Sequence, residues 1–558
     1  MTANSPELND YGLWLAKFTP KEEELAAQRS FVWEEPPLIS VVVPVHDTEI
    51  ICLREMIESV LNQTYAHWEL CVADGDSISH RVREVIKEYA KRDSRVKYVF
   101  LKENTGISGH TNEAAKLASG SYLAFVDSDD ILAPNALFEV AKAIAENPGA
   151  ALLYTDSDYW DSGEGKAYKP QFKPGWSPVY FLFNNYIVHL VVIAKALFNQ
   201  AGKLAAKYDG CQDTDIILKV SEISDQFIHI PRILYSWRKH RSQTSLPKSL
   251  SQANRLSELT IQVRKDHLKR MGLSEEDIKW FLSGVVPSRA AGISVSVLIP
   301  FYGGRVRLNQ CLDSIFKQEG PFKIEIIIVD LSEADENWED EYAKGVKVTK
   351  IPSHLNKWNV SEVYNFAAES AKGEYLVFLN SHSLLREFTF TELLRISLYP
   401  KTGAAGCAVH YYNNMKFFVG GQEYAGSNMP LENWYGRKNT LPKTNITTGF
   451  FNVDTRINNV TALSDVCVMI RRDLFDLSGG FATDYPLTFF MTDLCLRLRG
   501  MGCYNILYRF PLSCWQAEHP AYGRALENFN SELAVFKGKY ERLLRKPDPY
   551  LNPNAVLY

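Results

Sequence analysis

Two stretches of the chain alternate apolar runs with amphipathic segments in the same order. Residues 38–46 read LISVVVPVH and residues 293–301 read ISVSVLIPF, and each is a β-branched run that reaches a proline near its end. Such runs are typical of buried strands. Segments between them, such as LREMIESVLNQ and RVREVIKEYAKR, have apolar residues three and four apart and indicate helices. This alternation predicts an α/β fold with a mostly parallel sheet covered on both faces.

The two stretches correspond to each other as copies of one unit, roughly 250 residues apart. In each copy a second strand follows the proline at the same interval and ends in an acid, Asp74 in the first and Asp330 in the second. TNEAAKLASGSYLAFVD then aligns with YNFAAESAKGEYLVFLN, which places Asp127 opposite Asn380. The sequence therefore predicts two tandem domains of the same fold.

The domain boundaries can be read from changes in pattern. A polar helical stretch follows RKHRSQTSLPKS and separates the copies, and 558 residues are enough for two large domains. We expect an N-terminal extension, a first domain, a helical linker, a second domain and a helical tail, over residues 1–38, 39–245, 246–290, 291–523 and 524–558.

Composition narrows the class of protein. Hydrophobic residues make up 46% and charged residues 23%, as in a packed globular protein, and the net charge of −5 gives no general attraction to nucleic acid. No apolar run approaches the roughly 18 residues of a membrane span, and MTANSPELND does not read as a secretory signal. The nine cysteines form no C-x-x-C pair. We therefore expect reduced thiols and a cytoplasmic location.

An acidic cluster is the strongest chemical signal. FVDSDD places Asp127, Asp129 and Asp130 at the end of an apolar strand, the edge at which α/β sheets bind ligands. Carboxylates there could hold Mg²⁺ or Mn²⁺ together with a diphosphate. The same residues could instead cap the following helix. Neither a G-x-G-x-x-G turn after the first strand nor a Walker loop is present, so a phosphate would be bound differently.

Eight motifs follow one another in residues 39–240: VVVPVHDT, QTYAHWELCVADGDS, NTGISGHTNEAAKLASG, FVDSDDILAPNAL, LLYTDSDYW, FKPGWSP, GCQDTDIILKV and HIPRILYSWRKH. In this order they resemble the family 2 glycosyltransferases of the GT-A fold, particularly the bacterial group that builds O-antigen and related surface polysaccharides. The resemblance implies two tandem GT-A domains, a UDP- or dTDP-sugar as donor, Mn²⁺ or Mg²⁺ as cofactor, and a glycan acceptor that could be lipid-linked.

The resemblance also implies roles for individual residues. The positions that would bind the sugar nucleotide are Pro44, Val45, His46, Asp47, Asp74, Asp127 and Ser128. Asp129, the second acid of the D-x-D motif, and His240 would hold the metal, and Asp213 would be the general base. Two alternatives stay open: Asp213 could cap its helix with Asp215 as the base, and His240 could be a surface residue.

The second copy retains the repeated frame but lacks the reactive groups. Two-domain relatives carry L-N-x-D, F-N-D-x-D and Y-H-H-E there, whereas this chain has LNSHS, FFMTDLCLRL and SCWQAEH. His382, Met491 and Gln516 thus replace an acid, the base and a histidine. A thioether cannot accept a proton at neutral pH. We expect residues 291–523 to be inactive, although His382 could still bind a metal.

The sequence leaves two further features of the second half open. Its aromatic residues at 410–414, 433–436 and 450–451 could stack on sugars or serve as core anchors. The tail places Leu533, Phe536 and Tyr540 at helical spacing among basic residues. That pattern favours packing on its own domain, or else peripheral contact with the inner face of the cell membrane.

The leading hypothesis is an inverting, metal-dependent hexosyl or deoxyhexosyl transferase with one active site in the first domain. It would extend a surface polysaccharide, an O-antigen or a glycoprotein glycan. The alternatives are a bifunctional polymerase with two active domains, a non-catalytic glycan-binding scaffold and, least favoured, a nucleotidyltransferase. The sequence does not identify the sugar, the linkage or the oligomeric state.

Overall fold

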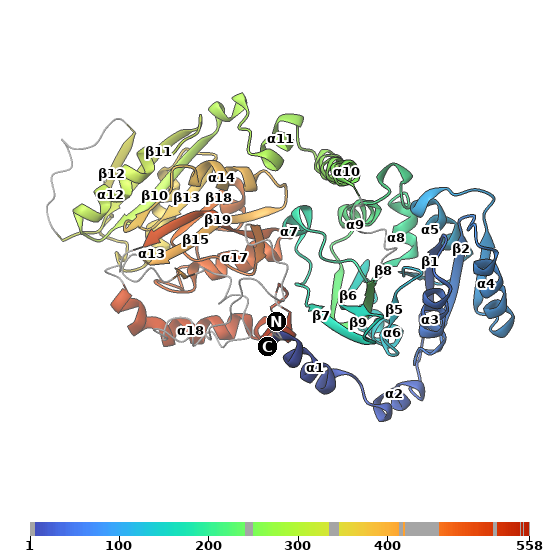
Figure 1. The fold of residues 1–558 in the computed structure, drawn as a ribbon. Helices are drawn as coiled ribbons and strands as arrows, with labels where there is room; N and C mark the ends of the chain where they lie inside the picture. The colour runs from blue at the N-terminus through green and yellow to red at the C-terminus, as the bar shows by residue number, and fades with distance from the viewer. Residues whose placement is uncertain are drawn as a thin grey trace.

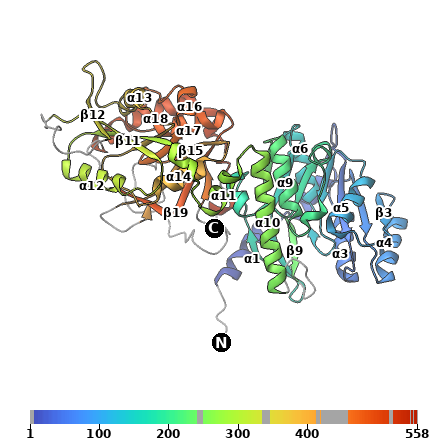
Figure 2. The same ribbon diagram turned by 90° about the horizontal axis from the view of Figure 1, so that it is seen from above.

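The computed structural model describes residues 6–239, 249–333, 345–411, 417–418, 457–516, 522–546, 548–550 and 552–556. In these ranges the chain forms two α/β domains that lie side by side, and two linker helices connect them (Figure 1). The view from above shows the same arrangement, with α10 between the domains (Figure 2). The predicted tandem architecture is confirmed.

The first sheet has the strand order β3-β2-β1-β4-β8-β6-β9-β5, with β7 paired to β6. The four strands from β3 to β4 run parallel, whereas β8 is antiparallel to both of its neighbours, and β6 and β9 are parallel to each other. The strands are β1 (Ile39–Val45), β2 (Trp68–Asp74), β3 (Val96–Phe100), β4 (Tyr122–Phe125), β5 (Ile131–Leu132), β6 (Leu152–Asp161), β7 (Lys166–Gln171), β8 (Val191–Ala194) and β9 (Phe227–Lys239).

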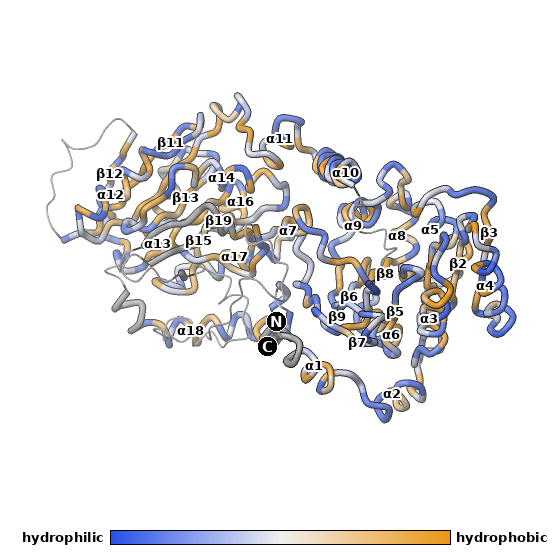
Figure 3. Tube along the Cα trace, in the orientation of Figure 1, coloured by the Kyte–Doolittle hydropathy of each residue, from blue (hydrophilic) through white to orange (hydrophobic). Residues whose placement is uncertain are grey.

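Helices cover both faces of this sheet because successive strand residues point to opposite sides. Val41 and Val43 pack in one core cluster with α3, α4 and α6, and Val42 packs in another with α5, α7 and α9. The helical elements are α3 (Ile50–Leu61), α4 (His80–Arg92), α5 (Gly106–Leu117), α6 (Ala136–Glu146), α7 (Pro178–Phe183), α8 (Lys195–Gln200), η1 (Ala206–Tyr208) and α9 (Gln212–Ile223). Figure 3 shows hydrophobic positions gathered on the central strands and hydrophilic stretches on outer helices such as α4.

The second sheet repeats the same order as β12-β11-β10-β13-β18-β15-β19-β14, with β16 and β17 added at β15 and β19. Its strands are β10 (Ser294–Phe301), β11 (Lys323–Asp330), β12 (Val346–Lys350), β13 (Tyr375–Leu379), β14 (Ser383–Leu384), β15 (Thr402–Tyr411), β16 (Phe417–Phe418), β17 (Ile457–Val460), β18 (Cys467–Arg471) and β19 (Tyr504–Gln516). Its helices are α12 (Arg305–Phe316), α13 (Val360–Ser370), α14 (Thr389–Ser397), α16 (Arg472–Leu477) and α17 (Phe490–Gly500).

The repeat extends to buried hydrogen bonds. Glu69 on β2 accepts hydrogen bonds from the hydroxyl of Ser40 (2.6 Å) and from the backbone N–H of Gly120 (3.1 Å). In the second domain Glu325 accepts from Ser296 and from the N–H of Gly373 (3.1 Å) in the same way. Glu69 thus joins β1 and β2 to the loop that leads into β4. Glu325 joins β10 and β11 to the loop that leads into β13 in the same way.

The linker forms part of the core. It comprises α10 (Leu250–Arg270), α11 (Glu275–Ser283) and η2 (Ser288–Gly292). Trp280 and Phe281 are fully buried in a core cluster that continues from the first domain to β10 and β11 of the second. The domains also meet directly, since the N–H of Tyr180 on α7 donates to Asn459 Oδ1 on β17 (3.3 Å).

Both ends of the described chain are attached to a domain. α1 (Pro6–Phe18) and α2 (Glu22–Arg29) precede the first strand, and the hydroxyl of Tyr11 donates to Asp158 Oδ2 (2.6 Å). α18 (Tyr522–Leu544) packs Phe529, Leu533 and Phe536 into the second domain. Packing of the tail on its own domain is one of the two predictions made from the sequence. The short helix η4 (Pro553–Val556) follows α18. Among the helices in the described ranges, none is long and apolar enough to cross a membrane.

Candidate functional site

The acidic loop follows β4 directly and is held by β9. The hydroxyl of Tyr235 donates to Asp130 Oδ2 (2.6 Å), and the N–H of Arg238 donates to Asp130 Oδ1 (2.8 Å). Asp130 is therefore a structural acid, whereas Asp127 and Asp129 remain partly exposed. The alternative interpretation of the sequence required these acids to cap α6. The N-cap of α6 is Asn135, so that interpretation is wrong.

His189 lies beside this loop. Its Nε2 is 3.5 Å from Asp127 Oδ2. Its Nδ1 is buried and has no hydrogen-bond partner among the described residues. Burial lowers the pKa of His189 to about 4 although the carboxylates of Asp213 and Asp129 oppose that shift, so the imidazole is neutral at physiological pH. A neutral imidazole has one donor nitrogen and one acceptor nitrogen, which can form hydrogen bonds with a substrate or with a neighbouring carboxyl group.

Asp213 completes the cluster from the start of α9. Its side chain is partly exposed, and burial raises its pKa, with Asp127 acting in the same direction and His189 against it. These three residues come from the loop after β4, the segment before β8 and the first turn of α9. Sequence reasoning missed His189. The available signal was a histidine within IVHLVV, directly before a strand that pairs with β4.

Asp213 and Asp215 differ in environment. Asp215 is fully buried, and its Oδ2 pairs with Lys219 Nζ four residues later (2.6 Å). In the second domain Asp493 Oδ2 pairs with Arg497 in the same i,i+4 relation (2.7 Å). Asp215 thus corresponds to Asp493 as part of a helix-bound ion pair, which leaves Asp213 as the acid that faces the site.

Two carboxyl groups of the acidic loop are harder to ionise than free ones, and a bound cation would stabilise their charged forms. Burial, and then the neighbouring carboxylate of Asp129, raise the pKa of Asp127 to about 7, and burial also raises the pKa of Asp130. Arg238, a cation beside this loop, already pairs with Glu55 (2.5 Å). A divalent cation held by one or two carboxylates and by substrate phosphates fits this donor set.

The remaining metal predictions can be placed only in part. In the described ranges no three histidine, cysteine, aspartate or glutamate side chains form a group that could hold a metal by themselves. His240, the second predicted ligand, lies outside the described residues.

The loops predicted to bind the nucleotide come together beside the acidic loop. The carbonyl of Val45 accepts from Gly75 N–H (2.8 Å), and His46 Nδ1 lies 3.0 Å from Gly75 O. Asp47 has a φ of +50° and accepts from the N–H of Ile78 (2.8 Å). Pro44, which precedes them, is the one partly exposed residue of β1, between the buried Val43 and Val45.

These loops also contact the acidic loop and enclose an ion pair. The hydroxyls of Thr48 and Ser128 lie 2.6 Å apart, which joins the loop after β1 to the loop after β4. Asp74 is fully buried and accepts from Arg83 Nε (2.7 Å) and from the N–H of Ser77 (3.3 Å). A base or ribose that contacts Asp74 would share this carboxylate with Arg83.

The equivalent site of the second domain is different. The paired strands place Asn380 where the first domain has Asp127, and Val466 where it has His189. Met491 takes the place of Asp213, and His382 that of Asp129. Asp493, the acid left on α17, is bonded by Lys539 (2.5 Å) and Tyr540 (2.7 Å) of α18. The aromatic residues at 412–414, 433–436 and 450–451 lie outside the described residues.

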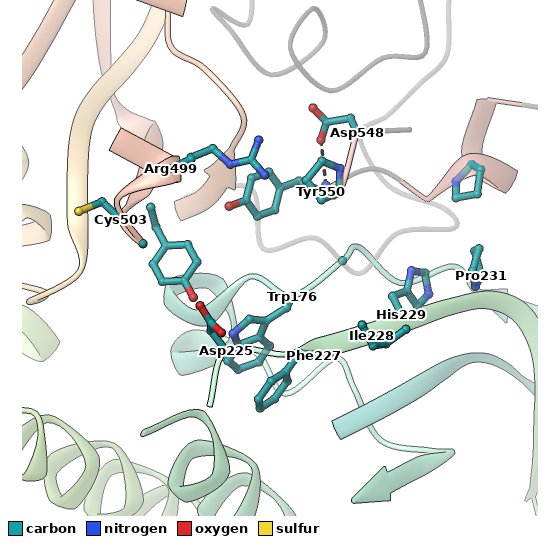
Figure 4. Close-up of a pocket in the computed structure, with 15 residues that line it drawn as sticks. Trp176, Asp225, Phe227, Ile228, His229, Pro231, Arg499, Cys503, Asp548 and Tyr550 are labelled. Atoms are coloured by element: carbon teal, nitrogen blue, oxygen red, sulfur yellow. Dashed lines mark hydrogen bonds between the residues drawn. The ribbon is translucent and has the colours of Figure 1, made fainter. Parts of the chain in front are cut away.

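Two cavities have no residue of the acidic loop in their linings. One of about 140 Å³ is bordered by Lys173, Asn185 and Val188, next to His189. The other, of about 440 Å³, lies between the domains (Figure 4). Its labelled residues include Trp176, Phe227 and His229 on the first-domain side and Arg499 and Tyr550 on the other.

Comparison with known proteins gives a consistent picture. A family model described as "Glycosyl transferase family 2" matches residues 40–201 and 296–477. An uncharacterised protein y4gI of Sinorhizobium fredii is 30% identical over 545 residues, which cover 93% of this chain and 58% of that protein. The O-antigen biosynthesis protein RfbC of Myxococcus xanthus is 30% identical over 570 residues, 99% of this chain and 43% of that protein.

The chain thus spans about half the length of these two relatives. Among solved structures, Staphylococcus aureus TarS residues 1–349 in complex with UDP-GlcNAc aligns with a TM-score of 0.35 and 19% identity, over 45% of this chain and 77% of that one.

Proposed function

The chain belongs to glycosyl transferase family 2, and from this premise we propose that it transfers a sugar from a nucleotide-sugar donor to a hydroxyl of a growing surface glycan. The reaction would be a single, inverting displacement that depends on a divalent metal. The active site would lie in the first of the two GT-A domains. The donor would be a UDP- or dTDP-sugar carrying a hexose or deoxyhexose.

One observation carries the choice of domain. The first domain brings Asp127, His189 and Asp213 together at one edge of its sheet. The second domain repeats the sheet but has an amide, an isopropyl group and a thioether at the corresponding positions. None of those three groups can act as a base at neutral pH. This difference supports placing the proposed chemistry in the first copy.

The loops after β1, β2 and β4 would bind the donor. These loops follow the carboxyl ends of their strands, the edge at which a nucleoside diphosphate would sit, and the hydroxyl of Ser128 lies 2.6 Å from that of Thr48. Asp129, with His240, would hold Mn²⁺ or Mg²⁺. The bound ion would neutralise the charge that develops on the leaving diphosphate.

Asp213 would act as the general base. The acceptor hydroxyl would lose its proton to the Asp213 carboxylate as its oxygen bonds to the anomeric carbon of the donor sugar. The bond from that carbon to the diphosphate oxygen would break at the same time, so the nucleoside diphosphate leaves and the anomeric configuration inverts. A raised pKa suits this role because a general base works best when its pKa approaches the working pH.

The acceptor would be a glycan of a polysaccharide, an O-antigen or a glycoprotein. The relative named for O-antigen biosynthesis, which aligns along nearly the whole chain, supports the first two. A lipid-linked acceptor would place the enzyme in the cytoplasm at the inner face of the membrane. Leu543 and Leu544 of α18 are partly exposed next to Arg542 and Arg545, which would suit a peripheral contact.

A panel of UDP- and dTDP-sugars tests the proposal. Purified protein would be incubated with each donor and Mn²⁺ or Mg²⁺, and release of the nucleoside diphosphate would be measured with and without glycan acceptors. We expect one or a few donors to be turned over only with metal, and Asp213→Asn to remove turnover. If no donor binds or is turned over, the non-catalytic scaffold is favoured instead.

A further inference from the structure

The last acid of the degenerate site anchors the C-terminal helix. Asp493 is fully buried on α17, and Lys539 Nζ (2.5 Å) and the Tyr540 hydroxyl (2.7 Å) of α18 both donate to its Oδ1. Nearer the start of α18, the buried Glu532 accepts from the N–H and hydroxyl of Thr488 (2.8 and 2.7 Å). Two buried carboxylates thus fix α18 on the second domain.

After α18 the chain crosses to the first domain. We call its described residues, 548–550 and 552–556, the strap. On the second-domain side Asp548 bonds to the Thr461 hydroxyl, and the guanidinium of Arg499 lies over the ring of Tyr550 (5.2 Å). Figure 4 shows Asp548 and Tyr550 next to Arg499, with Trp176 and His229 of the first domain across the cavity.

On the first-domain side the strap ends in buried polar contacts. Asn552 is 2% exposed, and its Nδ2 donates both to Asp156 Oδ2 (2.7 Å) and to the carbonyl of Lys173 (3.0 Å). Asn554 Nδ2 donates to the carbonyl of Pro231 (2.8 Å). A Cβ on Gly175 would lie 1.7 Å from the carbonyl oxygen of Pro549, so the strap passes where only glycine fits.

The residues that Asn552 contacts hold the segment that carries His189. Asp156 is fully buried, and its Oδ1 accepts from the N–H of Lys173 (2.9 Å) and lies 2.8 Å from His229 Nε2. The ammonium of Lys173 is also buried and donates to the carbonyls of Ile187 (3.0 Å) and His189 (2.6 Å). A continuous set of hydrogen bonds therefore connects Asn552 to the backbone of His189.

We propose that the second domain acts as a positioning domain: it holds the strap, whose Asn552 fixes Asp156 and Lys173 and thereby keeps His189 directed at Asp127. The effect on turnover rests on the proposed function, in which the cluster of Asp127, His189 and Asp213 forms the active site. The contact of the strap with the first domain does not depend on that function. The strap is a positioning element, because Asn552 acts through Lys173 and does not touch the proposed substrate site.

The energetic reason lies in the buried charges. A buried carboxylate or ammonium is stable only while its hydrogen-bonding positions are filled. The side-chain amide of Asn552 donates to Asp156 Oδ2 and to the carbonyl of Lys173 at the same time. Its loss would leave a buried charge short of a partner, and the segment of residues 173–189 would relax. A shift of about 1 Å at a catalytic group can reduce turnover by about 100-fold.

Variants on both sides of the contact test this inference. In the whole 558-residue chain, Asn552→Ala removes the two N–H donors, and Asn552→Asp keeps the side-chain volume but turns a carboxylate toward Asp156. Gly175→Ala displaces the strap from the first domain. A stop after Lys546 removes the strap and leaves α18. Asn530→Ala, at an exposed position of α18, is the matched control.

Two readouts separate the outcomes. We expect kcat to fall about 10- to 100-fold in the strap variants while the donor KM changes less than about threefold, because the nucleotide loops are not touched. Amide hydrogen exchange in residues 184–190 should rise in the same variants and not in Asn530→Ala. Wild-type kcat and wild-type exchange in Asn552→Ala, Asn552→Asp and the truncated chain would overturn the proposal.

The exchange measurement also keeps the two proposals apart. If the wild-type protein transfers no sugar, the proposed function fails, and unchanged exchange at residues 184–190 would still refute the strap. If the wild type is active and the variants lose exchange protection without losing kcat, the strap is structural only and the positioning role is refuted.

Discussion

His189 Nε2 lies 3.5 Å from Asp127 Oδ2, and this pair distinguishes the two copies of the fold. The second domain has Val466 and Asn380 at the corresponding positions of equivalent strands. The pair forms because β8 is antiparallel to β4, so the residue that leads into β8 meets the residue that follows β4. In the proposed reaction, a neutral imidazole there would hold the carboxylate of Asp127 in place while the donor and the metal bind.

Replacing His189 should reduce turnover more than stability. In His189→Ala we expect kcat to fall about 100-fold, the order of the effect of a positioned polar group. The protein should remain folded, as judged by circular dichroism and thermal unfolding. His67→Ala, an exposed histidine of the same domain, is the matched control. Wild-type kcat in His189→Ala would show that the residue has no part in transfer.

Asp213 and Asp215 should respond in opposite ways. Asp213→Asn removes the proposed base, so transfer should fall by about 100- to 10,000-fold with little loss of stability. Asp215→Asn breaks a buried ion pair with Lys219 and should lower the unfolding temperature, while the folded fraction retains turnover. Steady-state kinetics and thermal denaturation on both variants decide the assignment. If Asp215→Asn is inactive but stable, the base is Asp215.

Activity should be lost on the acid side of the pH range. Burial raises the pKa of Asp213, and a general base works only when it is deprotonated. As pH falls through this raised pKa, kcat/KM should therefore fall, with a midpoint above the ordinary aspartate value of about 3.9. The pH profile of wild-type transfer measures this limb. Residual transfer by Asp213→Asn should not follow it, and a profile that stays flat to pH 4 would contradict the role of Asp213.

The second domain should contribute no linkage of its own. If it were active, as a bifunctional polymerase requires, His382→Ala would remove one of two products. We expect His382→Ala to leave the product linkages, analysed by mass spectrometry and NMR, unchanged. Asp493→Asn should instead loosen α18, because it weakens the contacts with Lys539 and Tyr540. Loss of a distinct linkage in His382→Ala would establish a second active site.

The sequence predicts the parts of this molecule that local pattern determines. Apolar strands that reach Pro44 and Pro300 give the repeat and the parallel half of each sheet, and FVDSDD gives the acidic loop. His189 was missed because its role depends on the antiparallel pairing of β8 with β4. The bond from Asn552 to Asp156 joins residues 396 positions apart, and no periodicity indicates such a contact.

Glu69 is a buried acid whose contribution to stability depends on pH. Burial alone would raise its pKa, but the hydrogen bonds from Lys97, Ser40 and Ser119 outweigh burial and lower the pKa to about 2. A carboxyl group with a lowered folded-state pKa adds stability above its unfolded pKa, near 4.3, and loses that contribution as pH falls toward the folded value. The contribution is therefore complete at pH 7 and is lost between about pH 4.3 and 2.

Replacing Glu69 by glutamine should therefore destabilise the first domain at neutral pH. The amide side chain of Glu69→Gln would keep an acceptor for Ser40 but lose the charge that pairs with Lys97, so we expect a loss of up to about 3 kcal/mol at pH 7. Urea unfolding at several pH values measures it, and the difference from wild type should shrink as pH falls below about 4. Glu84→Gln, at an exposed position on α4, should change stability by less than about 0.5 kcal/mol. A Glu69→Gln protein as stable as wild type at pH 7 would mean that the hydrogen bonds at this site, and not the charge, hold β1, β2 and the loop before β4 together.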